Sequence, residues 1–463
     1  MPDFAKWFFV SYAQIYEAYV ERTLIKFVYS WRKNSCKSGC KGDSESTLRN
    51  KGGIFFMKKI DGGVTAAKGF MATSTAAEIK YKGRDDMALV YSVVPAKVAG
   101  VFTKNVVKAA PVQWDRDIVK KEEFAQAVVL NSGIANACTS KEGLSINEQM
   151  AQAVATALDL PLRSVLTAST GVIGMQIPIE RAVNGIRTMS KQLNEDLEAG
   201  NAAAKAIMTT DTISKECAVQ FEIDGKTITI GGMSKGSGMI HPDMATMLCV
   251  ITTDLAISKE LLQEAVRTDV VSSFNMISVD RDTSTNDSMI VLANGKAENP
   301  EITKKDENYK TFCDALASVT HTLAKMMAGD GEGATKLFET IVMNAKTKQD
   351  AITLSKSVIT SNLVKTAVYG SDANWGRIIC ALGYSGVEFN PEIVDLYIES
   401  NGQRIKLFEN GMATNYSEEE ATKILSAEHV TAIADMKQGT ETATAWGCDL
   451  TYDYVKINGD YRS

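Results

Sequence analysis

The stretch that decides the fold is Gly236-Ser237-Gly238-Met239-Ile240-His241-Pro242-Asp243-Met244-Ala245-Thr246-Met247-Leu248. A glycine-rich turn leads through Pro242 to an apolar segment that continues as the strand-like run Cys249-Val250-Ile251. A single hydroxyl, that of Thr246, stands between apolar neighbours where this strand begins. A buried threonine at a strand start is commonly structural. A threonine that performs chemistry needs a general base, and the chain offers only 3 histidines.

Length and composition set the broad class. The chain has 463 residues, of which 45% are hydrophobic, enough for roughly two or three layers or domains. Its net charge of -6 disfavours nucleic acid as a partner, because a nucleic-acid-binding face carries a basic excess. The 8 cysteines form no disulfide framework, which indicates a reducing cytoplasm. Cys138, Cys249 and Cys380 stand among apolar residues, so we expect them to be buried. No metal site is expected from so few histidines.

Residues 1–56 differ from the rest of the chain. The aromatic and apolar stretch from Trp7 to Trp31 is interrupted by charged residues, so it is a poor membrane span, and it lacks the features of a signal peptide. Lys51-Gly52-Gly53 is what a purine-rich ribosome-binding sequence gives when translated, and Met57 follows shortly after. We therefore hypothesise that translation starts at Met57 and that 1–56 is an over-extended reading frame. The alternative is an amphipathic surface helix.

After Met57, strand and helix signals alternate. Apolar runs predict strands at 127–130 and 165–167, and Asp224-Gly225 and Asn401-Gly402 predict hairpin turns. Helices are predicted from a capping box at Ser145 and Glu148, from Pro178, and at 258–272, 308–328, 350–368 and 417–427. Hairpins mixed with helices favour α+β layers over a purely parallel sheet. A smaller C-terminal domain is expected from about residue 350.

The familiar nucleotide-binding motifs are missing from the sequence. The glycine-rich runs at 232–236 and 330–333 match neither a dinucleotide-binding fingerprint nor a phosphate-binding loop. An N-terminal nucleophile remains. If the Ala245–Thr246 bond is cut, the new α-amine of Thr246, with a pKa of about 8, can act as base for its own hydroxyl. From these residues alone, self-cleavage and a structural threonine both stay open.

Several motifs carry a resemblance to a known family. The run from Lys235 to Leu248 resembles the self-cleaving signature of the ornithine acetyltransferase family, also called the glutamate N-acetyltransferase or ArgJ family. The resemblance extends from Lys58 to Ser463. It includes Asn131-Ser132-Gly133, Ala135-Asn136-Ala137-Cys138-Thr139, Ser169-Thr170-Gly171-Val172-Ile173-Gly174, Thr209-Thr210-Asp211-Thr212, Phe274-Asn275-Met276-Ile277-Ser278-Val279-Asp280, Asp282-Thr283-Ser284-Thr285-Asn286-Asp287, the run 443–455 and Ile457-Asn458.

This resemblance implies both a fold and an activity. The fold is an α+β layered α/β sandwich of the ArgJ/DmpA type, in an N-terminal-nucleophile enzyme that processes itself into an α fragment, 57–245, and a β fragment, 246–463. The implied reaction is a ping-pong transfer of acetyl from N-acetyl-L-ornithine to Thr246 and on to L-glutamate, in cytoplasmic arginine biosynthesis. An α2β2 heterotetramer is implied, and no cofactor. Some members of the family also use acetyl-CoA as a co-substrate.

The site residues carry over by matching motif. Thr246 resembles the nucleophile, and Thr170 with Gly171 resembles the oxyanion hole. Lys235 resembles a lysine that binds the α-carboxylate shared by ornithine and glutamate. Glu332 resembles an acid that holds a substrate ammonium; the plainer alternative is a solvated loop carboxylate, as we expect for Asp330. The remaining residues that resemble substrate contacts are Thr209, Asn458 and Ser463.

Three departures from the family pattern stand out. Arg281 replaces a glycine and is expected either to pair with the neighbouring aspartates or to crowd a turn. Ile134 replaces an asparagine at the cost of a polar contact, and Ser463 replaces a threonine. His241 is expected to be structural rather than a metal ligand. Two alternatives to the transferase remain: an aminopeptidase or amidase of the same architecture, and an uncleaved, non-catalytic binding protein.

Overall fold

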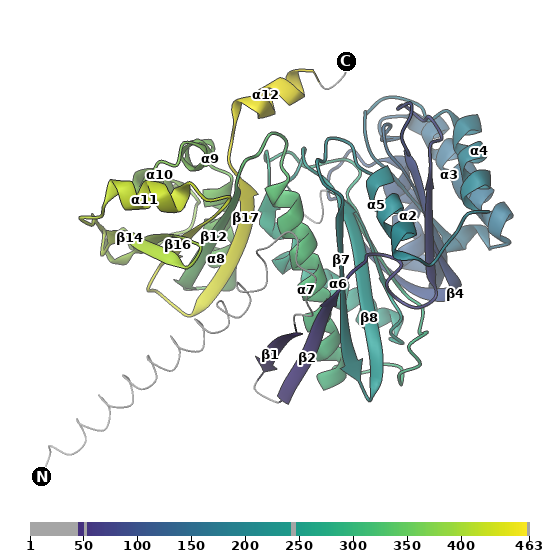
Figure 1. The fold of residues 1–463 in the computed structure, drawn as a ribbon, viewed down its shortest axis with the longest axis horizontal. Helices are drawn as coiled ribbons and strands as arrows, with labels where there is room; N and C mark the ends of the chain where they lie inside the picture. Colours follow the sequence, from purple (N-terminus) through teal and green to yellow (C-terminus); the bar gives the residue numbers. More distant parts are fainter. Residues whose placement is uncertain (1–44, 51–52, 242–246, 461–463) are drawn as a thin grey trace, which may run out of the picture.

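Two β-sheets and their helices make up the described part of the chain (Figure 1). The structure is a computed structural model that describes residues 45–50, 53–241 and 247–460, with side chains from Met57 onward. The predictions for Ala245, Thr246 and Ser463 lie outside the described residues, as does most of 1–56. The division of the chain into fragments and domains stays a prediction.

The larger sheet has 10 strands, in the order β1-β2-β7-β8-β9-β11-β4-β5-β6, with β3 paired to β4 off this path. Its innermost strands are buried on both faces, which explains their continuous apolar runs. The bounds are β1 Glu45–Asn50, β2 Gly53–Ile60, β3 Phe70–Thr75, β4 Met87–Phe102, β5 Phe124–Asn131, β6 Val165–Ser169, β7 Lys215–Ile223, β8 Lys226–Lys235, β9 Leu248–Thr253 and β11 Ser288–Ala293.

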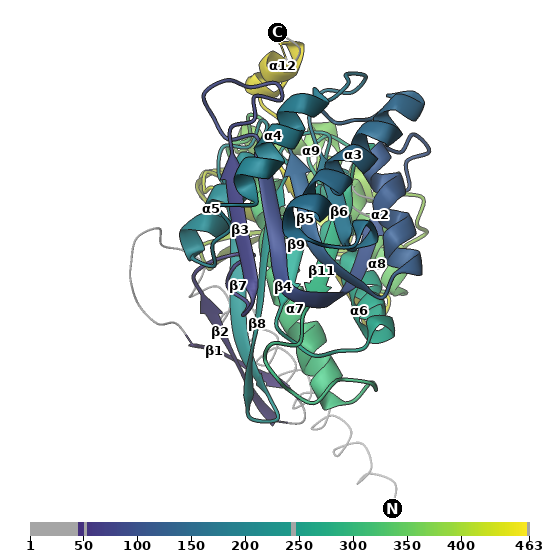
Figure 2. The same cartoon turned by 90° about the vertical axis from the view of Figure 1, so that its right-hand side faces the viewer.

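Helices cover both faces of this sheet. On one face, α2 (Ala110–Lys121) and α5 (Leu197–Ala206) share a core with Val128 and Leu130 of β5. On the other face, α3 (Ser140–Leu158) and α4 (Ile179–Met189), in front of the strands in Figure 2, share a core with Ala127 and Val129 of β5. Helices α6 (Lys259–Ser272) and α7 (Glu307–Gly329) share a core with Cys249 and Ile251 of β9. Strand β9 shows the two faces in its alternation: Cys249 and Ile251 join the core beside α7, whereas Leu248 and Val250 join the core on the opposite face.

The second sheet has 7 strands, in the order β10-β17-β12-β16-β13-β14-β15. Helix α7 packs against β7 and β8 of the first sheet and against β12 and β17 of the second, which joins the two sheets into layers. The α+β layered fold is therefore confirmed. The bounds are β10 Ile277–Ser278, β12 Leu337–Ala345, β13 Asp395–Ser400, β14 Gln403–Glu409, β15 Met412–Ala413, β16 His429–Asp435, β17 Glu441–Cys448, α8 Lys348–Ile359, α9 Asn362–Tyr369, α10 Trp375–Gly383, α11 Glu418–Leu425 and α12 Tyr452–Gly459.

The local predictions are largely confirmed, with instructive exceptions. Both hairpins form, as β7–β8 and β13–β14. The predicted capping box is wrong, because Ser145 lies inside α3 and the helix begins at Ser140. The predicted helix 350–368 is two helices, because the Ser361 side chain accepts a hydrogen bond from the Val364 N–H and caps a new helix, α9.

The cysteine prediction is confirmed for one thiol and wrong for two. Cys249 is buried in β9, but Cys138 and Cys380 are exposed. Cys138 stands in the loop before α3 with φ 56°, and Cys380 points outward from α10. Apolar sequence neighbours did not imply burial in either place, because the neighbours of a loop or helix residue face different directions.

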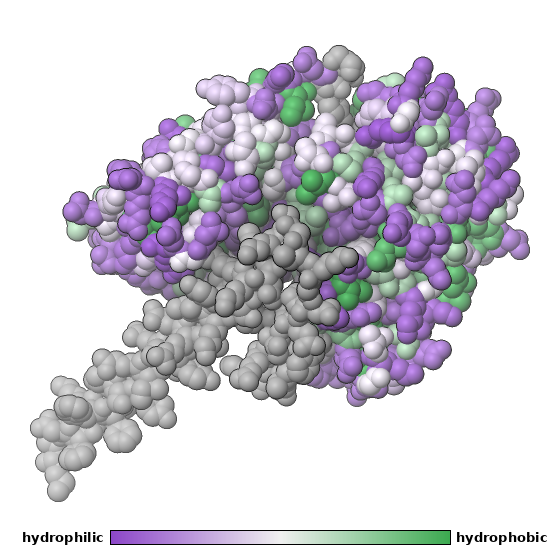
Figure 3. All heavy atoms as spheres, viewed as in Figure 1, coloured by the Kyte–Doolittle hydropathy of each residue, from purple (hydrophilic) through white to green (hydrophobic). Residues whose placement is uncertain are grey.

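The surface in Figure 3 is mainly hydrophilic, with apolar residues scattered singly or in small groups. Such scattered apolar residues are ordinary on a folded domain. Among the residues that the structure describes, no helix combines the length and the apolar character needed to cross a bilayer.

Candidate active site

A cavity of about 260 Å³ opens where several strands of the larger sheet end. It brings together six of the residues predicted for the site. Met247, which directly follows Thr246 in the chain, lines the same cavity. The six are Thr170, Gly171, Thr209, Lys235, Glu332 and Asn458.

The sheet topology explains why these residues meet. Lys235, the last residue of β8, is the register partner of Leu248, the first residue of β9. The segment with the predicted cleavage site therefore joins the adjacent ends of two neighbouring strands. The parallel strands β5 and β6 end side by side, with Asn131 opposite Ser169, so the loops that follow them meet at one edge. Catalytic groups in layered α/β folds commonly lie on such loops.

Thr170 and Gly171 offer two different donors. The Thr170 N–H already donates to the Asn131 carbonyl oxygen at 3.0 Å, which leaves its hydroxyl for a ligand. That hydroxyl oxygen accepts a hydrogen bond from Lys235 Nζ at 3.4 Å. The Gly171 N–H has no acceptor within the described ranges, and its φ of 127° suits glycine. One hydroxyl and one backbone N–H can thus point at a developing oxyanion.

Lys235 is the cation of the cavity. Its side chain is 9% exposed, and Nζ donates to Thr209 Oγ1 at 2.8 Å and lies 3.8 Å from Asp211 Oδ2. Burial lowers the pKa of Lys235, and the Lys215 ammonium adds to this effect, while Asp211, Glu332 and Asp287 oppose it. A substrate carboxylate would favour the charged form of this lysine in the same way as Asp211 does.

Glu332 supplies a carboxylate to the same cavity. Its Oε2 accepts a hydrogen bond from Asn458 Nδ2 at 2.7 Å, so α12 reaches the cavity through Asn458. The carboxyl group packs so closely on Gly238 that a β-carbon there would lie 2.3 Å away. The expectation that Asp330 is a solvated loop carboxylate is wrong: it is buried and pairs with Lys215 at 2.6 Å.

Sequence reasoning missed some residues that hold the cavity in shape. Asn286 Nδ2 donates to the carbonyl oxygens of Ala135 at 2.6 Å and Ser169 at 2.8 Å, and so ties together the loops after β5 and β6. Asp211 is a second such residue. The signal was present, since both lie in motifs that the family resemblance includes, but nothing in the spacing showed which member of each motif faces a ligand.

The structure shows the surroundings of two residues that depart from the family pattern, Arg281 and Ile134. Arg281 has φ 72°, a left-handed conformation that favours glycine, and it forms no ion pair with a described residue. The Ile134 side chain lies in an apolar core and not in the cavity, while its carbonyl oxygen accepts from Asn131 Nδ2 at 2.9 Å. His241 Nδ1 lies 3.1 Å from Ser278 Oγ, a contact that fits a structural role.

A second, larger cavity of about 800 Å³ lies between α2 and the start of α3. None of the predicted site residues lines it, so size alone does not identify the functional site. The smaller cavity is the candidate site, because a cation, a carboxylate and the hydrogen-bond donors of Thr170 and Gly171 meet there. In the described ranges, no group of three or more histidine, cysteine, aspartate or glutamate side chains is arranged to hold a metal ion.

Comparison with known proteins identifies the family. The ArgJ family model matches residues 71–463. The chain belongs to the ArgJ family. The six predicted site residues that line the cavity fall inside the range matched by the family model, and so does Thr246.

Individual relatives agree with this assignment. The chain is 48% identical over 407 residues to the arginine biosynthesis bifunctional protein ArgJ of Caldanaerobacter subterraneus subsp. tengcongensis, covering 88% of this chain and 100% of that protein. It is 50% identical over 409 residues to the ArgJ protein of Symbiobacterium thermophilum, with 88% and 100% covered.

Solved structures include two ArgJ-type proteins. The arginine biosynthesis bifunctional protein ArgJ of Bacillus halodurans is 47% identical, with a TM-score of 0.43, and the match covers 45% of this chain and 96% of that chain. The ornithine acetyltransferase of Mycobacterium tuberculosis, solved in complex with ornithine, is 38% identical, with a TM-score of 0.38 and coverage of 42% and 100%.

Proposed function

We propose that this chain is an acetyltransferase of arginine biosynthesis that moves the acetyl group from N-acetyl-L-ornithine to L-glutamate. Family membership supports the reaction class. The observation that carries the proposal is the meeting of Lys235, Glu332 and the Thr170–Gly171 donors in one cavity beside Met247. Lys235 fits the α-carboxylate that both amino acids share, and Glu332 fits the side-chain ammonium of ornithine.

The proposed nucleophile is Thr246. Cleavage of the Ala245–Thr246 bond would free the α-amine of Thr246, which then takes the proton of its own hydroxyl as that oxygen attacks the acetyl carbonyl. The Thr170 hydroxyl and the Gly171 N–H would stabilise the resulting oxyanion, each by roughly 3 kcal/mol. Collapse breaks the acetyl C–N bond, the α-ammonium returns the proton to the departing ornithine amine, and acetyl-Thr246 remains.

The second half-reaction reverses the same steps with a different amine. The α-amine of glutamate attacks the acetyl ester, the threonine oxygen leaves and regains its proton, and N-acetyl-L-glutamate departs. Because both substrates use the same carboxylate contact at Lys235, one cavity serves both halves of a ping-pong cycle. The proposal includes an α2β2 assembly and a cytoplasmic location, and acetyl-CoA as a further donor stays a prediction.

Intact-mass analysis under denaturing conditions tests this function. We expect two fragments divided at Ala245–Thr246, an acetyl increment on the β fragment after incubation with N-acetyl-L-ornithine, and its loss when L-glutamate is added. Thr246→Ala should give one uncut chain, while Thr414→Ala, directly after β15 of the second sheet, should be cut normally. An uncut wild-type chain would refute the mechanism. If the acetyl group were lost to water without glutamate as fast as it is lost with glutamate, the chain would instead be a hydrolase, the aminopeptidase or amidase of the alternative interpretation.

The same spectrum tests the start of the chain. An α fragment whose mass begins at Met57, from a gene with its native initiation region, would support the proposed start codon. A mass that includes residues 1–56 would refute it.

A further inference from the structure

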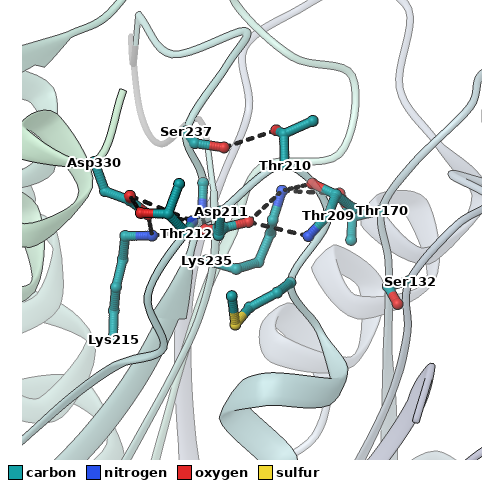
Figure 4. Close-up of polar contacts among 12 residues, drawn as sticks. Ser132, Thr170, Thr209, Thr210, Asp211, Thr212, Lys215, Lys235, Ser237 and Asp330 are labelled. Carbon is teal, nitrogen blue, oxygen red and sulfur yellow. Dashed lines mark hydrogen bonds and ion pairs between the residues drawn. The ribbon is translucent and has the colours of Figure 1, made fainter. Parts of the chain in front are cut away.

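Three buried charges, those of Asp211, Lys215 and Asp330, lie next to one another, and Asp211 lies beside Lys235, which lines the cavity (Figure 4). Lys215, the first residue of β7, has a fully buried side chain whose Nζ lies 2.7 Å from Asp211 Oδ1 and 2.6 Å from Asp330 Oδ2. Asp330 caps the C-terminal end of α7, and Asp211 lies in the loop after α5. Even a paired cluster of buried charges is often no more stabilising than apolar side chains of the same size, so this cluster points to a role beyond packing.

Asp211 connects the two segments that present groups to the cavity. Its Oδ1 accepts a hydrogen bond from the Gly236 N–H at 2.7 Å, and its Oδ2 accepts one from the Thr209 N–H at 3.1 Å. The same carboxylate lies 3.8 Å from Lys235 Nζ. One buried side chain therefore fixes the backbone on both sides of the contact between Lys235 and Thr209.

Asp330 extends the chain of charges toward Glu332. It accepts hydrogen bonds from the N–H of Thr212 at 3.1 Å and from the Thr212 hydroxyl. Two residues further on, the Glu332 N–H donates to the Ser237 carbonyl oxygen at 2.8 Å. The buried charges thus run from the cation of the cavity to the segment that carries its carboxylate.

We propose that Asp211, Lys215 and Asp330 are positioning residues. Asp211 holds the Lys235 ammonium in place and in its charged form, and Lys215, paired with Asp330, holds Asp211, so that the cavity selects ligands with an α-carboxylate. The identity of the substrate in this inference rests on the proposed function, whereas the arrangement of the residues does not depend on it. None of the three residues lines the cavity, so each acts through Lys235.

The charges around Lys235 make the proposal specific. Burial lowers the pKa of Lys235, and the Lys215 cation lowers it further. The anions Asp211, Glu332 and Asp287 raise it. Burial alone would raise the pKa of Asp211, but the Lys235 and Lys215 ammonium groups lower it below its usual range, so Asp211 stays ionised. Removing the charge of Asp211 and removing that of Lys215 should therefore shift the titration of Lys235 in opposite directions.

The first test measures KM and kcat for N-acetyl-L-ornithine against pH. Asp211→Asn keeps one acceptor oxygen, enough for one of the two backbone N–H groups, and removes the charge, so KM should rise about tenfold and begin its increase at a lower pH than in the wild type. Lys215→Met should move that increase to a higher pH. In both variants kcat should change less than KM, because the carboxylate contact is made before and during the reaction.

The control is Asp395→Asn, which removes a buried carboxylate paired with Lys406 and Lys437 in the second sheet, far along the chain from the cavity segments. It should leave the pH profile unchanged. If Lys215→Met does not fold, Asp330→Asn replaces it and should shift the profile in the same direction as Asp211→Asn, by a smaller amount. Shifts in the same direction for Asp211→Asn and Lys215→Met, or none in either, would overturn the proposal.

A binding measurement separates this inference from the proposed function. Calorimetry with L-ornithine and with 1,4-diaminobutane, which lacks the α-carboxylate, should show a preference for ornithine that Asp211→Asn reduces about tenfold. A preference that survives in Asp211→Asn would refute the positioning role. If the wild type transferred no acetyl group yet kept this preference, the proposed reaction would fail and the positioning role would stand.

Discussion

A β-carbon at Gly171 would lie 2.2 Å from the carbonyl carbon of Gly133, so two loops touch backbone to backbone beside the cavity. Gly171→Ala must displace one of them, because backbone atoms cannot yield as a flexible side chain does. We expect kcat for acetyl transfer to fall by roughly 10²–10³, the effect of losing one oxyanion donor. Steady-state kinetics of the fully cleaved protein would measure this.

Gly174 provides the matched control for that change. It also has a positive φ, 84°, but a β-carbon there meets nothing within 4 Å. Gly174→Ala should cost about 1 kcal/mol of strain and leave kcat near the wild-type value. Equal losses of kcat in the two variants would show that the contact with Gly133 does not position the donor.

Gly238 leaves the space that the Glu332 carboxyl group occupies. A β-carbon at Gly238 would push this group away from Asn458, and since the carboxyl ends a flexible side chain, the fold should tolerate the change. Gly238→Ala should raise KM for N-acetyl-L-ornithine about tenfold and affect glutamate less, because glutamate has no side-chain ammonium. Glu332→Gln should show the same pattern. Equal effects on both substrates would contradict the role assigned to Glu332.

Asp269 on α6 should make stability depend on pH. Burial raises its pKa to about 7, although the hydroxyls of Thr320 and Ser273 donate to its carboxylate. Since the pKa in the unfolded chain is about 3.9, the folded protein binds an extra proton between these values, and stability falls as pH rises through that window. Asp269→Asn should therefore stabilise the protein on the order of 4 kcal/mol at pH about 7, and little at pH about 4. Urea unfolding at both pH values measures this; a gain independent of pH would contradict it.

Arg281 adopts a left-handed backbone that costs a non-glycine residue roughly 1–2 kcal/mol. Arg281→Gly removes this strain but adds roughly 0.5–1 kcal/mol of chain entropy, so a net stabilisation of about 0.5–1 kcal/mol is expected. Arg281→Ala keeps the strain and serves as the control. Thermal unfolding of the two variants decides the point, and an equal gain in both would assign the effect to the lost charge.

Much of the fold was predictable from local patterns. The hairpins at Asp224-Gly225 and Asn401-Gly402 form as expected, because the turn residues and the alternation around them act over a few positions. The start of α3 was not, because Ser145 and Glu148 have the spacing of a capping box although they lie inside the helix. The residue that the sequence did not flag is Gly143 in the first turn, where a β-carbon would lie 1.9 Å from Thr139 Oγ1.

The residues of the site likewise fall into those that motifs predicted and those that they did not. Thr170, Lys235 and Glu332 were expected there from motifs, and the structure brings them together. The position of Asp330 depends on a contact with Lys215, 115 positions away along the chain, and Asp211 meets the Gly236 N–H 25 positions away. No local pattern can show that a carboxylate in a loop meets a buried lysine from another element.

The order of strands in the larger sheet determines what cleavage would do to the two fragments. Strands β9 and β11 stand together between β8 and β4, so residues from after the predicted cut are hydrogen-bonded on both sides to residues from before it. Cleavage at Ala245–Thr246 would then sever the chain without releasing either part. We expect that fragments made separately would assemble poorly, because the central strands of one would have to insert between strands of the other. The peptide bond between Ala245 and Thr246 would thus be needed only during folding, to hold the two parts together until the sheet has formed.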